Sequence, residues 1–277
     1  MKSLIQFELM KLARRRTILF VIFMLNVGPL CYLAMTFPVL RWSAPEFQAS
    51  FVLFSKAMPE IFILNGIYMI PFCLMMFVSE MWIGEIRNRS FMTLILTQAS
   101  RWRILLAKVA SLLFITLGCH VIFVSLFHLS ITLVTLTFPA SMTGPLEIDR
   151  LAALQNMAKF LGFNMVTLLP VVLFCCLLGL ISPSMKRAIV LALVMILTMC
   201  YIENRIEEYY EISPDRASWV FLSPYFAAHD RILVAAAFTG SPLNWWNPST
   251  HLQIALANAL LFWALTLSLV NRKQFEK

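Results

Sequence analysis

One short segment, residues 85–108, concentrates the side chains that are best suited to chemistry in this chain. It reads EIRNRSFMTLILTQASRWRILLAK and holds an acid, four arginines and a lysine around an apolar centre. Within it Phe91, Leu94 and Ile95 recur at i, i+3 and i+4, which predicts a short amphipathic helix. Ser100 is a candidate cap for the start of the next helix. A solvated basic loop needs no apolar stripe. The stripe therefore indicates a surface that contacts either lipid or a partner protein, and the residues alone leave both open.

Sites for covalent catalysis or metal binding are not indicated elsewhere in the sequence. The chain contains no GxxxxGK, HExxH or GxSxG motif. Its histidines do not cluster with acids or cysteines at the spacing of metal ligands. Its six cysteines all fall within apolar runs and form no CxxC pair, which is typical of small apolar filler. We therefore expect no enzyme activity, no metal and no cofactor in this chain.

The composition predicts that these residues are positioned by membrane helices. Of the 277 residues, 60% are hydrophobic and only 13% are charged, and the mean hydropathy is +0.81. A soluble domain is roughly 25% charged, so a cytosolic enzyme, a secreted disulfide scaffold and a disordered regulator are excluded. The net charge of +8 would suit nucleic acid. Membrane proteins also collect Lys and Arg on cytoplasmic loops, so we expect no nucleic-acid partner.

Apolar runs of membrane-spanning length divide the chain into six predicted transmembrane helices. A bilayer core of about 30 Å takes about 20 helical residues. The stretches that reach or approach this length are 17–37, 61–78, 105–136, 160–181, 188–202 and 254–270. The third is long enough to tilt or protrude, and the fifth is the shortest. The sequence predicts an all-α integral membrane protein with a single transmembrane domain, residues 1–277.

The distribution of basic residues predicts the orientation. With the N-terminus in the cytoplasm, six spans return the C-terminus to the same side. The inner segments then hold 15 of the 22 Lys and Arg residues, as expected for cytoplasmic loops. The seven on the outer side are Arg41, Lys56, Arg150, Lys159, Arg205, Arg216 and Arg231.

Two further segments lie outside the predicted spans. In residues 1–16, Ile5, Leu9 and Leu12 fall at i, i+4 and i+7, while Glu8 and Lys11 lie elsewhere around the helix. This pattern predicts a helix lying in the inner membrane interface. Residues 203–250 are punctuated by prolines and rich in Trp and Tyr, which favour the headgroup level. We expect them to form short helices at the outer interface.

The 85–108 segment resembles the hallmark of the ABC type-2 transporter permease family. That pattern is, in outline, Glu, a Gly-Thr pair four residues later, Leu-Leu, Pro-Val-Ser-Arg, Ile-Leu and Lys. The chain matches it without a gap at Glu85, Leu94, Ile95, Ser100, Arg101, Ile104, Leu105 and Lys108. It departs at Arg89-Ser90, where Gly-Thr is usual, and at Gln98-Ala99, where the family has proline and a β-branched residue. Residues 7–16 and 221–240 look like the family's interfacial helix and outer segment.

The resemblance implies the membrane subunit of an ATP-binding cassette exporter in the bacterial cytoplasmic (inner) membrane. Two copies, expected as a homodimer, would dock two separate ATPase subunits that bind ATP and Mg. Residues 85–100 would form the coupling helix seated in the ATPase, and the run from Arg101 into the third span would act as a lever. The residues that this assigns to ATPase coupling are Glu85, Arg87, Arg89, Phe91, Leu94, Ile95, Ser100 and Arg101. The alternatives for Glu85 and Arg101 are that they pair within the chain, or that they merely follow the positive-inside distribution of charge.

The cargo is only broadly constrained by the sequence. Four amides in four spans, Asn26, Asn65, Asn164 and Asn258, are candidates for a translocation path, or they hydrogen-bond the helices to one another. The span interiors are expected to lack charge, which favours a peptide, lipid-like or drug-like cargo. Two other classes remain: a scaffold subunit that transmits force from an ATPase without moving cargo, and a membrane-embedded enzyme. The enzyme is disfavoured because no paired acids or histidines stand near an interface.

Overall fold

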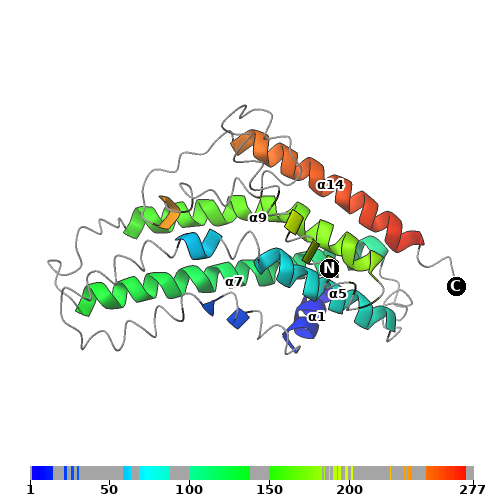
Figure 1. Cartoon of the computed structure of the whole chain (residues 1–277), viewed down its shortest axis with the longest axis horizontal. Coiled ribbons are helices and arrows are strands. Elements are labelled where there is room, and N and C mark those ends of the chain that lie inside the picture. Colours follow the sequence, from blue (N-terminus) through cyan, green and yellow to red (C-terminus); the bar gives the residue numbers. More distant parts are fainter. Residues whose placement is uncertain are drawn as a thin grey trace.

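Five long α-helices dominate the computed structural model. They are α1 (Lys2–Ala13), α5 (Ile70–Arg87), α7 (Arg101–Thr137), α9 (Arg150–Ile181) and α14 (Pro248–Arg272) (Figure 1). The structure describes residues 2–14, 22–23, 26–27, 30, 59–63, 69–87, 100–137, 150–182, 184, 187, 190–191, 193–194, 197–198, 201, 225, 234, 236–238 and 248–272. No strand occurs within these ranges, so the predicted all-α class is confirmed for the described part of the chain.

Helix α9 lies at the centre of the arrangement. It packs against α5, α7 and α14, and α1 packs on α7. In Figure 1 the long helices α7 and α9 run alongside each other, while α14 crosses α9 obliquely. The 37 residues of α7 give it a length of roughly 55 Å, which exceeds the bilayer core of about 30 Å. The predicted third span is therefore long enough to protrude from the membrane, as its sequence indicated.

Three of the described helices are long and apolar enough to cross a membrane. These are Arg101–Leu126, Leu151–Ile181 and Ser249–Arg272. They coincide with the predicted third, fourth and sixth spans, and they indicate a membrane-embedded protein. Most of the predicted first and fifth spans, 17–37 and 188–202, lies outside the described residues.

The helices extend beyond the apolar runs that predicted them. Helix α5 continues to Arg87, past the predicted end of the second span at Val78. Helix α9 begins at Arg150 instead of residue 160. The residues added to α9, RLAALQNMAK, are mostly strong helix formers. Hydropathy locates where a segment stops being apolar, whereas the backbone stays helical for as long as its own hydrogen bonds continue.

An aromatic cluster fixes the middle of α7 against α9. Phe62 is fully buried, and its ring centroid lies 5.2 Å from that of Phe123 and 5.3 Å from that of His120, both on α7. It also lies 5.7 Å from Phe160 of α9 and 5.5 Å from Phe238. Most of these pairs are edge-to-face, the arrangement that aromatic rings prefer. One side chain thus joins four segments that are distant in sequence.

Candidate functional site

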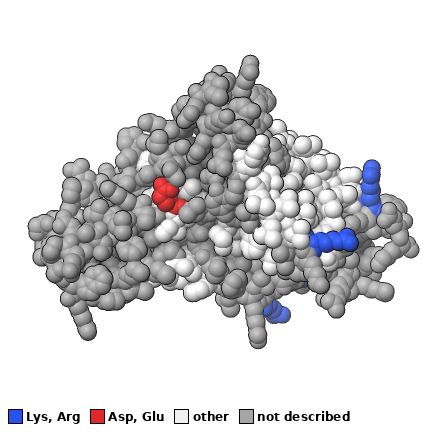
Figure 2. Space-filling model, in the orientation of Figure 1, with Lys and Arg blue, Asp and Glu red and all other residues white. Residues whose placement is uncertain are grey.

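Several helices have their termini together at one end of the bundle. We call this the basic end: it comprises the last residue of α5, the first of α7 and the last of α14, with α1 beside them (Figure 1). The basic side chains at this end that reach the surface are Lys11, Arg14 directly after α1, Arg101, Arg103 and Arg272, while Lys108 of α7 is buried. Figure 2 shows Lys and Arg on this side of the molecule, and the acidic side chain visible in that view lies well away from them. The residues that flank the predicted coupling segment are therefore gathered in one place.

A buried ion pair ties α1 to α7. The Lys108 ammonium lies 3.2 Å from the Glu8 carboxylate, and the two side chains are 0% and 1% exposed. Lys108 also lies 5.3 Å from the centre of the fully buried Trp82 ring of α5. Burying a charge is expensive unless an opposite charge compensates it. Lys108 therefore serves as a junction where α1, α5 and α7 are held together.

This ion pair corrects the predicted position of Glu8 on the N-terminal helix. Glu8 was expected on the polar side, with Ile5, Leu9 and Leu12 facing the membrane. Instead Glu8 and Leu12, one turn apart, are buried against α7, while Phe7 and Met10 are 46% and 57% exposed. In this orientation Glu8 supplies a counter-charge for the buried Lys108.

The Glu8 carboxylate depends heavily on Lys108. Its Oε2 accepts the hydrogen bond from the Lys108 ammonium. Its Oε1 is buried and has no hydrogen-bond partner among the residues that the structure describes. Loss of Lys108 would consequently leave a buried carboxylate with no described compensation.

A second tie joins the beginning of α7 to the end of α14. Arg101 Nη1 donates to the side-chain oxygen of Asn271 at 3.2 Å and approaches its carbonyl oxygen at 3.5 Å. Arg101 thus pairs within this chain, which is one of the alternatives that the sequence left open. Its predicted role in coupling stays untested.

Helix α7 begins where the sequence predicted. The Ser100 carbonyl accepts the backbone N–H groups of Arg103 and Ile104 at 2.9 and 3.2 Å, as the residue before a helix does. The Ser100 hydroxyl, expected as the cap, is buried without a hydrogen-bond partner in the described part of the chain. The position of the boundary is therefore confirmed, but the side-chain cap is not formed.

The structure describes only some of the predicted coupling residues. Glu85 and Arg87 belong to the last turns of α5, not to a separate helix starting at 85. This corrects the predicted 85–100 element: α5 runs without a break to Arg87, because no residue there interrupts its backbone hydrogen bonding. The remaining predicted contacts, Arg89, Phe91, Leu94 and Ile95, lie outside the described residues.

The asparagines predicted for a path or for helix pairing differ in their surroundings. Asn26 is buried and donates to the Ile22 carbonyl at 2.8 Å, within its own turn. Asn164 is buried and Asn258 half-buried, and no hydrogen bond joins any two of the three described amides. Asn65 lies outside the described residues. Both roles, lining a path and hydrogen-bonding helices to one another, stay predictions.

Another amide, which the sequence did not single out, does connect segments. Asn156 on α9 donates to the Ala236 carbonyl at 3.4 Å. Nothing in the sequence distinguishes it, since the added first turns of α9 were not predicted to be helical.

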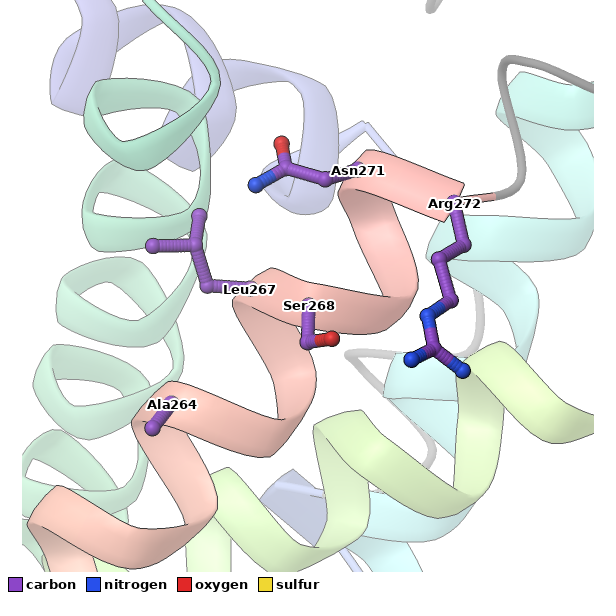
Figure 3. Close-up of a pocket in the computed structure, with 5 residues that line it drawn as sticks. All are labelled: Ala264, Leu267, Ser268, Asn271 and Arg272. Atoms are coloured by element: carbon purple, nitrogen blue, oxygen red, sulfur yellow. The ribbon is translucent and has the colours of Figure 1, made fainter.

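An open groove of about 420 Å³ lies on the last turns of α14 at the basic end. It is lined by Ala264, Leu267, Ser268, Asn271 and Arg272 (Figure 3). These positions follow i, i+3, i+4, i+7 and i+8 and so share one helix face. In Figure 3 Leu267 and Asn271 point to one side of this face and Arg272 to the other. The groove has apolar walls towards the middle of α14 and polar groups at its end.

Comparison with protein-family models and with curated proteins found no match for this chain. The described residues also contain no group of three His, Cys, Asp or Glu side chains arranged to hold a metal ion. The features that bear on function are therefore the basic end itself and the resemblance of the 85–108 segment.

Proposed function

We propose that this chain is the permease subunit of an ATP-binding cassette exporter, which takes force from a separate ATPase through residues 88–100. It crosses the membrane six times with both termini in the cytoplasm. This topology requires the ends of α5 and α14 and the start of α7 to lie on one side of the membrane, and these three termini lie at the same end of the bundle. Exposed basic residues lie there, as expected for a cytoplasmic face.

The observation that carries the proposal is the double attachment of the first turns of α7. Lys108 is bound to Glu8 of α1, and Arg101 is bound to Asn271 of α14. Both attachments lie within the first eight residues of a helix that continues unbroken to Thr137. A force applied to the segment before Ser100 therefore reaches α7 and is shared with α1 and α14.

The transmission of this force follows from how the helices pack. A stiff helix moves as a body, and packed interfaces shift between discrete arrangements instead of deforming smoothly. Movement of α7 is passed to α9 through the cluster around Phe62. ATP-driven closure of the ATPase pair would in this way switch the membrane helices between inward- and outward-facing states.

Binding of the ATPase is tested with charges placed on the predicted apolar stripe. Phe91→Asp and Leu94→Asp should each abolish most ATPase recovery, because the new charge must be desolvated in the docking groove. Thr93→Asp adds the same charge to the opposite side of the predicted helix and is the matched control. The tagged chain is purified from its native membrane in mild detergent, and the co-purified ATP hydrolysis is measured.

The outcomes separate the proposal from its alternatives. Retention of ATPase activity by wild type and Thr93→Asp, with loss in the other two variants, supports coupling. Equal recovery in all variants, or no ATPase with wild type, refutes it. In reconstituted vesicles, ATP-dependent accumulation of an amphipathic cargo supports export. ATP hydrolysis with no flux of any cargo supports force transmission to another protein.

A further inference from the structure

The groove on α14 has an apolar part and a polar, cationic part, which suits a ligand that carries both a hydrocarbon chain and an anionic group. Its apolar part is formed by Ala264 and Leu267, and its polar part by Ser268, Asn271 and Arg272. No described residue forms an ion pair with Arg272, and Ser268 makes no hydrogen bond through its side chain within the described part. A guanidinium, a hydroxyl and the Asn271 amide thus line a groove whose other described walls are hydrocarbon.

The polar groups of the groove lie near the end of a predicted membrane span, where the lipid headgroups are expected. The span Ser249–Arg272 contains 24 residues and is about 36 Å long, enough to cover a bilayer core of about 30 Å. Arg272 is the last residue of this span, so with the span centred in the bilayer Arg272 would stand at the height of the phosphate groups of one leaflet. The basic residues of neighbouring elements, including Arg101 and Arg103, mark this leaflet as one that attracts anionic lipid.

The apolar surface of α14 continues from the groove towards the bilayer centre. Leu260, Leu261 and Leu265 are 71%, 54% and 44% exposed. From Leu260 to Arg272 the helix rises about 18 Å, close to the half-thickness of the bilayer core, about 15 Å. An acyl chain attached to a headgroup at Arg272 would lie along this surface over the depth of one leaflet.

We propose that the α14 groove binds one anionic phospholipid, with its phosphate on Arg272 and Ser268 and an acyl chain along Leu267 and Ala264. The guanidinium supplies charge-assisted hydrogen bonds to the phosphate oxygens, the strongest kind available here. Because Asn271 also holds Arg101, the bound lipid sits beside the attachment between α14 and α7. The site depends only on the membrane location of α14 and not on the transport proposal.

The test measures lipid retention by the full-length chain in neutral detergent, using native mass spectrometry. The probes are phosphatidylglycerol and phosphatidylcholine with identical acyl chains, and inorganic phosphate alone. Both lipids offer a phosphate to Arg272, but phosphatidylcholine also carries a choline cation, which the neighbouring basic side chains repel. Wild type should therefore retain phosphatidylglycerol about tenfold better than phosphatidylcholine. Arg272→Gln should remove this preference, and Arg272→Lys should restore part of it. Lys159→Gln, an exposed change on α9, is the matched control and should behave like wild type.

A second variant tests the acyl-chain half of the site. Ser268→Phe fills the groove without changing its charge, so it should reduce retention of both lipids. The proposal is overturned if wild type shows no preference between the lipids, or if Arg272→Gln keeps it. It is also overturned if Ser268→Phe binds both lipids as wild type does. Inorganic phosphate alone should not be retained. If it binds as tightly as phosphatidylglycerol, the acyl chain contributes nothing, the site is one for a free anion, and the lipid proposal is refuted.

Discussion

Replacing Lys108 with methionine should release the N-terminal helix from α7. The change removes the counter-charge of Glu8 while nearly preserving side-chain volume. Breaking a buried ion pair by removing one partner costs about 3–5 kcal/mol, because the other charge stays buried. Glu8 is 1% exposed and its Oε1 already has no described hydrogen-bond partner, so no nearby described group offsets this cost. A free-standing 12-residue helix is marginal in water, so α1 would detach and lose its structure.

The assay is hydrogen exchange at residues 2–13 together with thermal unfolding in detergent. Lys108→Met should lose amide protection throughout α1, and Glu8→Leu should do the same by stranding Lys108. The double variant should recover most of the protection, because replacing both charges with apolar groups is often neutral or stabilising. Lys159→Met, the same substitution at an exposed position of α9, should change stability by no more than about 0.5 kcal/mol.

Two results would refute the reasoning. If the amides of α1 are equally protected from exchange in Lys108→Met and in Lys159→Met, the ion pair does not hold α1 against α7. If the double variant is as unprotected as either single variant, the two side chains act independently, and the buried charge is not the cause.

Three further perturbations test other parts of the structure. Arg101→Ala removes the exposed hydrogen bond to Asn271, which is worth at most about 1 kcal/mol, so assembly with the ATPase should persist. ATP hydrolysis should nevertheless become uncoupled from transport. A flux per ATP equal to that of the control variant Arg103→Ala would disprove this role. Cysteine labelling of intact cells should modify a cysteine at position 230 from outside but not one at position 88, and the reverse pattern would invert the topology. Phe62→Ala should destabilise the chain by about 3–5 kcal/mol through the cavity left among its aromatic neighbours, and an unchanged melting temperature would contradict the cluster's role.

The sequence alone predicted the helical class and the membrane location, since long apolar runs have few alternatives. A backbone in hydrocarbon must satisfy its own hydrogen bonds, and an apolar stretch of 20 residues does so as a helix. For this reason the third, fourth and sixth predicted spans coincide with described helices. Ser100 also marked the start of α7 correctly, since serine is typical of the position preceding a helix.

Hydropathy was less informative at the helix ends. Helix α5 reaches Arg87 and α9 begins at Arg150 because helix formation tolerates polar residues that an apolar stretch excludes. The groove of α14 was likewise not predicted, although Ser268 and Arg272 lie one turn apart on the same face. A single helix offers many such pairs, and packing against its neighbours decides which of them remain accessible.

The orientation of α1 was decided only by the tertiary structure. Its apolar stripe, taken by itself, directs Ile5, Leu9 and Leu12 towards the membrane. The residue that turns the helix is Lys108, 100 positions further along the chain, and no local periodicity contains that information. A carboxylate and an ammonium that would each be too costly to bury alone become compatible with the interior once the fold brings them within 3.2 Å of each other.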